Sequence, residues 1–299
     1  MKFKMLRRYV YRAFLLEIEN HLEKRKDRCL SMKIGNTEFD VSGKKHYIMG
    51  ILNVTPDSFS DGGTHNTIET ALRHTERMID EGAHMIDVGG ESTRPGYTKI
   101  SDQEEIERIA PVIEKIKTEF NIPISLDTYK SEVAKAGLAA GADLINDIWG
   151  LQYDGKMADV IAAANCPCCL MHNRREAVYG DFPAEYLSDI KRIVDTALSA
   201  GIKKEQMILD PGIGFGKDYQ QNLETMAHLE DLVAMGYPVL LGTSRKSMIG
   251  LTLDLPVTER VEGTLATTVY GCMKGALFFR VHDVKENARA LRMTEAMML

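Results

Sequence analysis

The sequence predicts an α/β protein folded as a single (β/α)8 TIM barrel, and two observations support this fold class. First, eight short apolar runs alternate with amphipathic segments from residue 47 onward. Second, each run is almost continuously hydrophobic, as strands covered on both faces are. Eight units favour a closed barrel over an open doubly wound sheet. The runs are residues 47–54, 83–88, 122–126, 142–145, 168–171, 207–209, 238–241 and 276–281.

The segments between the runs have the periodicity of helices that bury one face. Over residues 101–116, Ser101 and Glu104 form a capping-box pattern, and isoleucine or valine then returns every three or four positions. Residues 68–79 and 186–197 show the same spacing of apolar side chains. Each predicted strand is therefore followed by a helix that can pack against it.

The chain before the barrel divides into two parts. Residues 1–31 hold nine Lys and Arg against four acids, a net charge of +5. We interpret them as a helical extension outside the catalytic fold of residues 32–299. Targeting or membrane binding is the alternative, although a transit peptide would be rich in serine and the first serine is Ser31. Turn signals within residues 33–46 predict a short hairpin.

Composition excludes several classes of protein. The net charge of −6 argues against a general nucleic-acid binder, and no apolar run approaches the roughly 20 residues that span a bilayer. The five cysteines are odd in number, and three lie in residues 166–169, which indicates a reducing, cytoplasmic setting. Clustered thiols could bind zinc, but this run continues as an apolar strand, which favours core packing.

Polar residues end most of the predicted strands, where a barrel of this kind has its active site. One Asp or Asn at such a position could be a helix cap. So many at one mouth favour a shared site. They are Asn53, Asp87, Asp127, Asn146, Asp147, His172, Asn173, Asp210, Ser244 to Lys246, Arg280 and His282.

These side chains suggest two kinds of ligand group. Asp127, Asn146 and Asp210 offer acceptors for a ring with several N–H donors, such as a 2-aminopterin, because carboxylates in a covered mouth are costly unless paired. Other residues bind anions or hard cations, and a diphosphate with Mg²⁺ would satisfy both. Those residues are Thr93, Arg94, Arg280 and His282 for the anion and Asn53 for Mg²⁺, whereas Lys246 adds a donor and a positive charge on the ring side.

Eight motifs at these positions resemble dihydropteroate synthases. The runs I-M-G-I-L-N-V-T-P-D-S-F-S-D-G-G (48–63) and I-D-V-G-G-E-S-T-R-P-G (86–96) are similar to the two loop signatures of the family. The resemblance keeps its order from about Met32 to near the C-terminus. The six other motifs are S-L-D-T-Y-K (125–130), L-I-N-D-I-W-G (144–150), L-M-H (170–172), L-D-P-G-I-G-F-G-K (209–217), G-T-S-R-K-S (242–247) and R-V-H-D (280–283).

The resemblance implies an enzyme of folate biosynthesis that joins a 7,8-dihydropterin-6-ylmethyl diphosphate to p-aminobenzoate, giving 7,8-dihydropteroate and diphosphate. It also implies Mg²⁺, a homodimer and dissociative loss of diphosphate. By the same resemblance, Asp127, Asn146, Asp210 and Lys246 hold the pterin, and Met171, Phe215 and Gly242 line its slot. Asn53 contacts Mg²⁺; Arg280, His282, Thr93 and Arg94 meet the diphosphate; and Phe59, Asp61, Pro95 and Ser247 surround the p-aminobenzoate pocket, where sulfonamides compete.

Two other functions fit a pterin-binding barrel. A pterin-binding methyltransferase would share the pterin pocket, but it needs no diphosphate site, so the loop signatures and R-V-H-D count against it. A catalytically silent binding barrel would not need every site position to match. We therefore expect the synthase activity.

Overall fold

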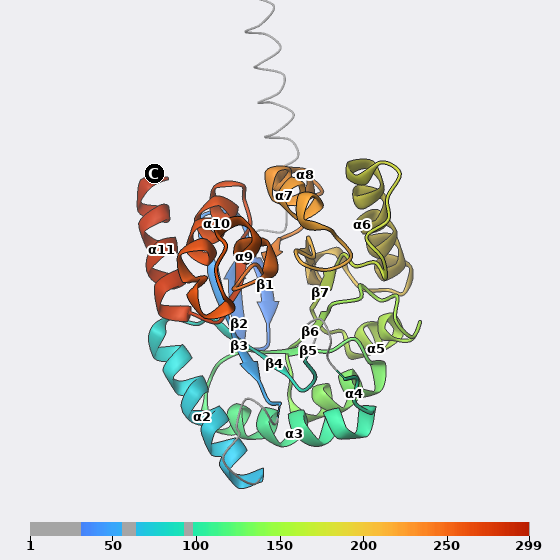
Figure 1. Ribbon diagram of the computed structural model, residues 1–299. Helices are drawn as coiled ribbons and strands as arrows, with labels where there is room; N and C mark the ends of the chain where they lie inside the picture. Colours follow the sequence, from blue (N-terminus) through green and yellow to red (C-terminus); the bar gives the residue numbers. More distant parts are fainter. Residues whose placement is uncertain (1–30, 56–63, 93–97, 299) are drawn as a thin grey trace, which may run out of the picture.

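The computed structural model describes residues 31–55, 64–92 and 98–298 and confirms the barrel (Figure 1). Within those residues, eight parallel strands follow the order β8-β7-β6-β5-β4-β3-β10-β9, and a bridge between Leu209 and Val239 joins the two ends of this order. Each predicted run overlaps one strand, and β4, β5, β6 and β8 extend one or two residues past their runs. The strands are β3 (Tyr47–Asn53), β4 (Met85–Gly89), β5 (Ile124–Asp127), β6 (Leu144–Asp147), β7 (Cys168–Met171), β8 (Met207–Asp210), β9 (Leu240–Leu241) and β10 (Phe278–Val281).

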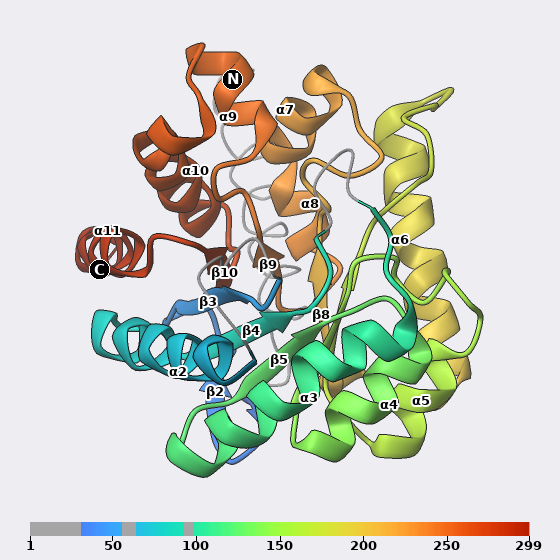
Figure 2. The ribbon, with the colours of Figure 1, turned by 60° about the horizontal axis from the view of Figure 1, so that its bottom comes forward.

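Helices surround the strands, as Figure 2 shows. No helix in the described ranges is long and apolar enough to cross a membrane. The α-helices are α2 (Thr64–Glu81), α3 (Asp102–Glu119), α4 (Ser131–Ala140), α5 (Met157–Ala164), α6 (Phe182–Ser199), α7 (Tyr219–Ala227), α8 (Leu229–Val233), α9 (Ser247–Leu253), α10 (Val261–Met273) and α11 (Val284–Met297), with 3-10 turns η2 (Lys204–Gln206) and η3 (Val257–Glu259).

Helix α3 shows why the periodic segments fold as predicted. Ile109, Val112 and Ile116 are buried on one face of the helix, against the outside of the strands. Oγ of Ser101 accepts the backbone N–H of Glu104 at 3.1 Å, so the predicted N-cap is present. The Glu104 side chain pairs with Arg108 rather than completing the capping box.

The predicted hairpin closes the N-terminal end of the barrel. Strands β1 (Ser31–Ile34) and β2 (Thr37–Asp40) pair antiparallel, so Ser31, which we assigned to the extension, belongs to the hairpin. Because this end is filled with apolar side chains, the other end is left for chemistry. The hairpin contributes Met32, Ile34, Phe39 and Val41 to one buried cluster, and the strands contribute Tyr47, Met49, Met85, Leu144, Cys169, Ile208, Leu240 and Phe278.

The cysteines of residues 166–169 lie in the core, as predicted. Cys168 and Cys169 are fully buried in β7, and Cys166 is buried just before it. Burial raises the pKa values of all three thiols, which keeps them protonated and unreactive.

Candidate active site

The parallel register places polar side chains from neighbouring strands on the last rung of the barrel. Asn53 pairs with Gly89, Gly89 with Asp127, and Asp127 with Asn146. A Cβ atom on Gly89 would lie 3.7 Å from both Oδ1 of Asn53 and Oδ2 of Asp127. The glycine therefore leaves these two oxygens facing a common space at the C-terminal end of the strands.

Arg280 of β10 joins two carboxylates of this mouth. Its Nε donates to Oδ2 of Asp87 and its Nη2 to Oδ2 of Asp127, each at 2.5 Å. Asp87 is wholly buried, and it also accepts from Oγ of Ser125 at 2.5 Å and from Nδ2 of Asn146 at 3.3 Å. Such pairing is what allows charges to persist in a protein interior. The structure thus brings Arg280, predicted for the diphosphate, to the residues predicted for the pterin.

Burial shifts the pKa values of these groups. It raises the pKa of Asp127 to about 7, although the charge on Arg280 opposes the rise. It also raises the pKa of Asp210 against the effect of Lys246, and it lowers the pKa of Lys246 to about 8. Burial opposes the charge on Arg280, but Asp87 and Asp127 outweigh it and raise the pKa of the guanidinium. Strongly perturbed groups that converge in this way are typical of functional sites.

Asp210, Gly242 and Lys246 form the other side of the mouth. A Cβ atom on Gly242 would lie 3.8 Å from Oδ2 of Asp210 and 3.8 Å from Nζ of Lys246, so the glycine keeps the space between the two charges open. Nζ of Lys246 donates to the carbonyl oxygen of Ile213 at 2.6 Å and lies 4.7 Å from the centre of the Phe215 ring. The loop after β8 therefore holds the lysine in place.

One wall of the mouth is apolar. Met171, at the end of β7, is buried with Tyr129 and Ile148, and Phe215 packs against them. The structure thus brings together Met171 and Phe215, which we predicted to line one slot. A flat heterocycle could lie along this wall with its edge towards the carboxylates.

His282 contacts Ser244 just beyond the strands. Oγ of Ser244 lies 2.9 Å from Nδ1 of His282 and accepts its backbone N–H at 3.1 Å. The serine therefore fixes the imidazole ring. Ser247, predicted for the p-aminobenzoate pocket, is exposed at the start of α9.

The ends of the second loop are held by a buried lysine. Nζ of Lys130 donates to Oε2 of Glu91 at 2.7 Å and to the carbonyl oxygen of Ile100 at 2.9 Å, and it pairs with Glu105 at 2.8 Å. The backbone N–H of Ile100 also donates to Oε2 of Glu91, at 2.9 Å. Glu91 and Ile100 are thereby fixed beside each other. Five predicted site residues lie outside the described residues: Phe59, Asp61, Thr93, Arg94 and Pro95.

Two of the strand-end polar residues have structural roles. Asp147 accepts the backbone N–H groups of Trp149 and Leu151, which fixes the turn after β6. Asn173 donates through Nδ2 to the carbonyl oxygen of Ile148 at 3.0 Å. Neither residue caps a helix, so their roles are to fix turns and differ from the N-cap alternative that we weighed from the sequence.

Sequence reasoning placed Asp87 and His172 in the shared strand-end site without a specific role, and it gave no place to Lys217, although each lies in one of the quoted motifs. Asp87 organises the contacts of Ser125, Asn146 and Arg280, and an acid inside an apolar strand was the available signal. Lys217 is buried against His172, with Nζ 2.8 Å from Nδ1. Nothing in the sequence indicates that pairing, because the two residues are far apart in the chain.

Known proteins resemble the chain over most of its length. A family model described as pterin binding enzyme matches residues 49–282. The dihydropteroate synthase of Clostridium beijerinckii is 60% identical over 265 residues, which are 88% of this chain and 98% of that protein. A crystal structure of the Clostridium difficile dihydropteroate synthase, obtained in the presence of pteroic acid, has a TM-score of 0.84 at 51% identity and covers 87% of this chain and 98% of that one. The Xanthomonas albilineans dihydropteroate synthase with 4-aminobenzoic acid has a TM-score of 0.85 at 41% identity, covering 90% and 98%.

Proposed function

The chain belongs to the dihydropteroate synthase family of pterin-binding enzymes. We propose that it catalyses the transferase reaction of this family at the C-terminal mouth of the barrel. The pterin diphosphate and p-aminobenzoate would meet there, and dihydropteroate and diphosphate would leave. The observation that carries the proposal is that Arg280, which pairs with Asp127, also lies beside Asp210 and Lys246 at Gly242, next to the apolar wall of Met171 and Phe215.

The pterin ring would lie between the two carboxylates. Its amino group and ring N–H groups would donate to Asp127 and Asp210, while Asn146 and Lys246 meet the remaining polar edge. Asp210 and Lys246 both border the space above Gly242, where a Cβ atom would lie in van der Waals contact with each. A ligand rich in N–H donors fits because the mouth holds more acidic than basic groups.

Arg280 and His282 would take the diphosphate. Arg280 uses Nε and Nη2 for Asp87 and Asp127, so the diphosphate would be met by the Nη1 hydrogens of the same fixed guanidinium. His282 is oriented by Ser244 and would add a second donor. Thr93 and Arg94 of the second loop complete this proposed anion site.

The donor chemistry at the end of β3 suits Mg²⁺ held mainly by substrate phosphates. Oδ1 of Asn53 faces the same space as Oδ2 of Asp127, and oxygen donors in small number are what Mg²⁺ accepts beside phosphate and water. No group of three acidic, histidine or cysteine side chains among the described residues could hold a metal alone, which agrees with a shared site. Mg²⁺ would supply charge neutralisation of the diphosphate.

The mechanism we propose is dissociative. The bond between the pterin methylene carbon and the diphosphate oxygen breaks first, and Arg280 and His282 stabilise the negative charge on the leaving group. The cation left on the pterin is stabilised by Asp127 and Asp210. The neutral aryl amine then forms the new C–N bond and loses a proton. No covalent enzyme intermediate is needed, so catalysis rests on positioning and electrostatics.

We propose a cytoplasmic homodimer that associates through the late helices. Exposed apolar side chains support this, because Tyr270 and Met273 on α10, and Met293 and Met297 on α11, are each at least 40% exposed. Adjacent exposed apolar residues are typical of an interface between subunits. The four described cysteines are free thiols, which fits a reducing compartment.

A turnover assay tests the function directly. The protein is mixed with the pterin diphosphate, p-aminobenzoate and Mg²⁺, and both dihydropteroate and diphosphate are measured. We expect equal amounts of the two products, and loss of both in Asp127→Ala and Arg280→Ala. Pterin binding without turnover would contradict the proposal and indicate the methyltransferase or the silent barrel.

A further inference from the structure

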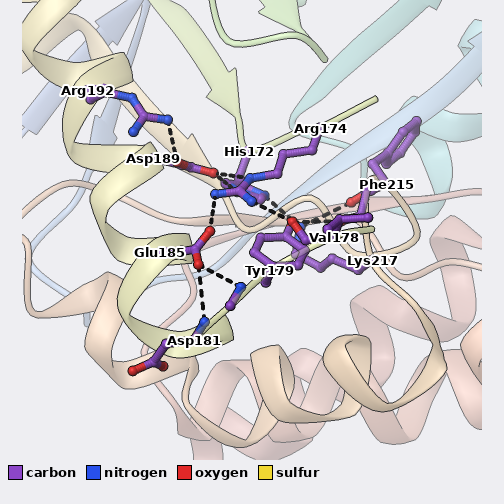
Figure 3. Close-up of polar contacts among 12 residues, drawn as sticks. His172, Arg174, Val178, Tyr179, Asp181, Glu185, Asp189, Arg192, Phe215 and Lys217 are labelled. Atoms are coloured by element: carbon purple, nitrogen blue, oxygen red, sulfur yellow. Dashed lines mark hydrogen bonds and ion pairs between the residues drawn. The ribbon is translucent and has the colours of Figure 1, made fainter. Parts of the chain in front are cut away.

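A buried lysine behind the site has three acceptors for its three hydrogens. Nζ of Lys217 lies 3.1 Å from the carbonyl oxygen of Gly212, 3.2 Å from that of Phe215 and 2.8 Å from Nδ1 of His172 (Figure 3). An ammonium group has three N–H donors and no acceptor, so these contacts match it fully. Burial lowers the pKa of Lys217 to about 7, with the charge on Asp210 opposing, so the ammonium form is present at neutral pH and below.

His172 accepts from Lys217 because its other nitrogen is already committed. Nε2 lies 3.2 Å from Oδ2 of Asp189 on α6, and burial lowers the pKa of the imidazole to about 3, so the ring is neutral. In a neutral ring, the nitrogen facing a carboxylate carries the hydrogen and the other one accepts. Asp189 is itself held by Arg174, whose Nε donates to Oδ2 at 2.5 Å. Asp189 of α6 therefore fixes the tautomer of His172, with the hydrogen on Nε2 and Nδ1 left to accept from Lys217.

The carbonyl groups that Lys217 binds belong to the loop after β8. That loop lies directly on the chain after β7: a Cβ atom on Gly212 would be 1.9 Å from the carbonyl oxygen of His172, and one on Gly216 would be 2.5 Å from the backbone nitrogen of Arg174. Both glycines also have positive φ, at +70° and +55°. The loop can therefore take this path only with glycine at these positions.

The same loop supplies both groups that hold Lys246. Nζ of Lys246 donates to the carbonyl oxygen of Ile213 and lies over the ring of Phe215. Ile213 and Phe215 lie between the two glycines that approach residues 172–174. A shift of this loop would thus move Lys246 relative to Asp210.

We propose that Lys217 is a positioning residue, which, aligned by His172, fixes the loop after β8 and so sets the place of Lys246 in the pterin site. This inference rests on the proposed function of that site. Lys217 itself does not touch the substrate, because its three hydrogens are directed at Gly212, Phe215 and His172. It acts only through the loop.

The test is a double-mutant cycle on pterin diphosphate binding, measured by calorimetry in the full-length protein. Lys217→Met should weaken binding by about 10- to 100-fold, by analogy with the outer-shell partners that orient metal ligands. In the Lys246→Met background the same change should have little further effect, because the residue through which it acts is gone. Lys117→Met is the matched control: Lys117 binds Asp143 at the N-terminal end of the barrel, and its loss should leave pterin affinity unchanged.

A second pair of variants remains decisive if Lys217→Met does not fold. The amide oxygen of His172→Asn can take the place of Nδ1 and accept from Lys217, whereas His172→Leu cannot. At matched thermal stability, the Asn variant should therefore bind the pterin diphosphate at least several-fold more tightly than the Leu variant. Trp149, the single tryptophan of the chain, packs against the same buried cluster as Phe215, and its emission should shift only in the Leu variant, without any ligand.

The outcomes separate this inference from the function on which it rests. Wild-type protein that fails to bind the pterin diphosphate would overturn the proposed function. Wild-type binding with equal losses for Lys217→Met in both backgrounds would overturn the inference alone. Equal affinities of the Asn and Leu variants would do the same.

Discussion

Replacing Asp87 with asparagine should destabilise the protein more than the loss of a single buried hydrogen bond would. Asp87 accepts from Ser125 and Arg280 at 2.5 Å and from Asn146 at 3.3 Å, with no solvent exposure. Breaking a buried ion pair costs about 3–5 kcal/mol, and the lower figure applies here because Arg280 keeps Asp127 as a partner. In a domain of this size, a loss of about 3 kcal/mol corresponds to a fall of roughly 6–12 °C in melting temperature.

Two measurements check this prediction. Thermal unfolding gives the stability, and turnover should fall by about 10- to 100-fold, because Arg280 and Asn146 lose the carboxylate that orients them. The matched control is Glu132→Gln, which removes one acid from the exposed pair with Lys135 and should cost at most about 1 kcal/mol. If Asp87→Asn melts and turns over like this control, the role assigned to Asp87 is wrong.

Four further predictions follow from the described contacts. Because the pKa of Asp127 is raised to about 7 in the folded state, its contribution to the free energy of unfolding is complete below about pH 4 and is lost as pH rises through 7. The free energy of unfolding measured with urea should therefore depend less on pH in Asp127→Asn than in the wild type. Asn53→Ala should raise the Mg²⁺ concentration for half-maximal turnover by about tenfold, or 1.4 kcal/mol, and an unchanged titration would remove Asn53 from the metal site. Ser101→Ala should cost about 1 kcal/mol by urea unfolding with kcat unchanged, since it removes only a helix cap. A chain beginning at Met32 should keep its turnover, and a truncation that folds without activity would contradict that.

The sequence was sufficient to predict the strands because burial on both faces leaves a simple pattern. Each of the eight runs overlaps a strand, and Asp127 and Asp210 end theirs, since polar side chains can follow an apolar run only where the barrel opens. The hairpin was predicted, but the packing of its Phe39 into the N-terminal end of the barrel was not. That contact depends on the interior volume of the closed barrel, which no local pattern encodes.

The pairing of charges could not be predicted in the same way. Arg280 was assigned to an anion by its residue type, yet it lies between Asp87 and Asp127. Which acid meets a given arginine depends on strand order and tilt, and β10 reaches these acids only because it lies beside β3 in the closed barrel. The contact of Lys217 with His172 depends likewise on how two loops cross.

Burial shifts the pKa values of the mouth, and its charge balance bears on the ligand that we propose for it. Asp87, Asp127 and Asp210 face Arg280 and Lys246, so the acids outnumber the bases in a space that water reaches poorly. Without a ligand, burial raises the pKa of Asp127 to about 7, and protonation of this carboxyl group lowers the cost of the excess. A ring that presents N–H donors and develops positive charge during the reaction relieves it better, and most fully when its cation forms. The same imbalance that makes the unliganded site costly thus favours the transition state over the ground state, which is the condition for catalysis.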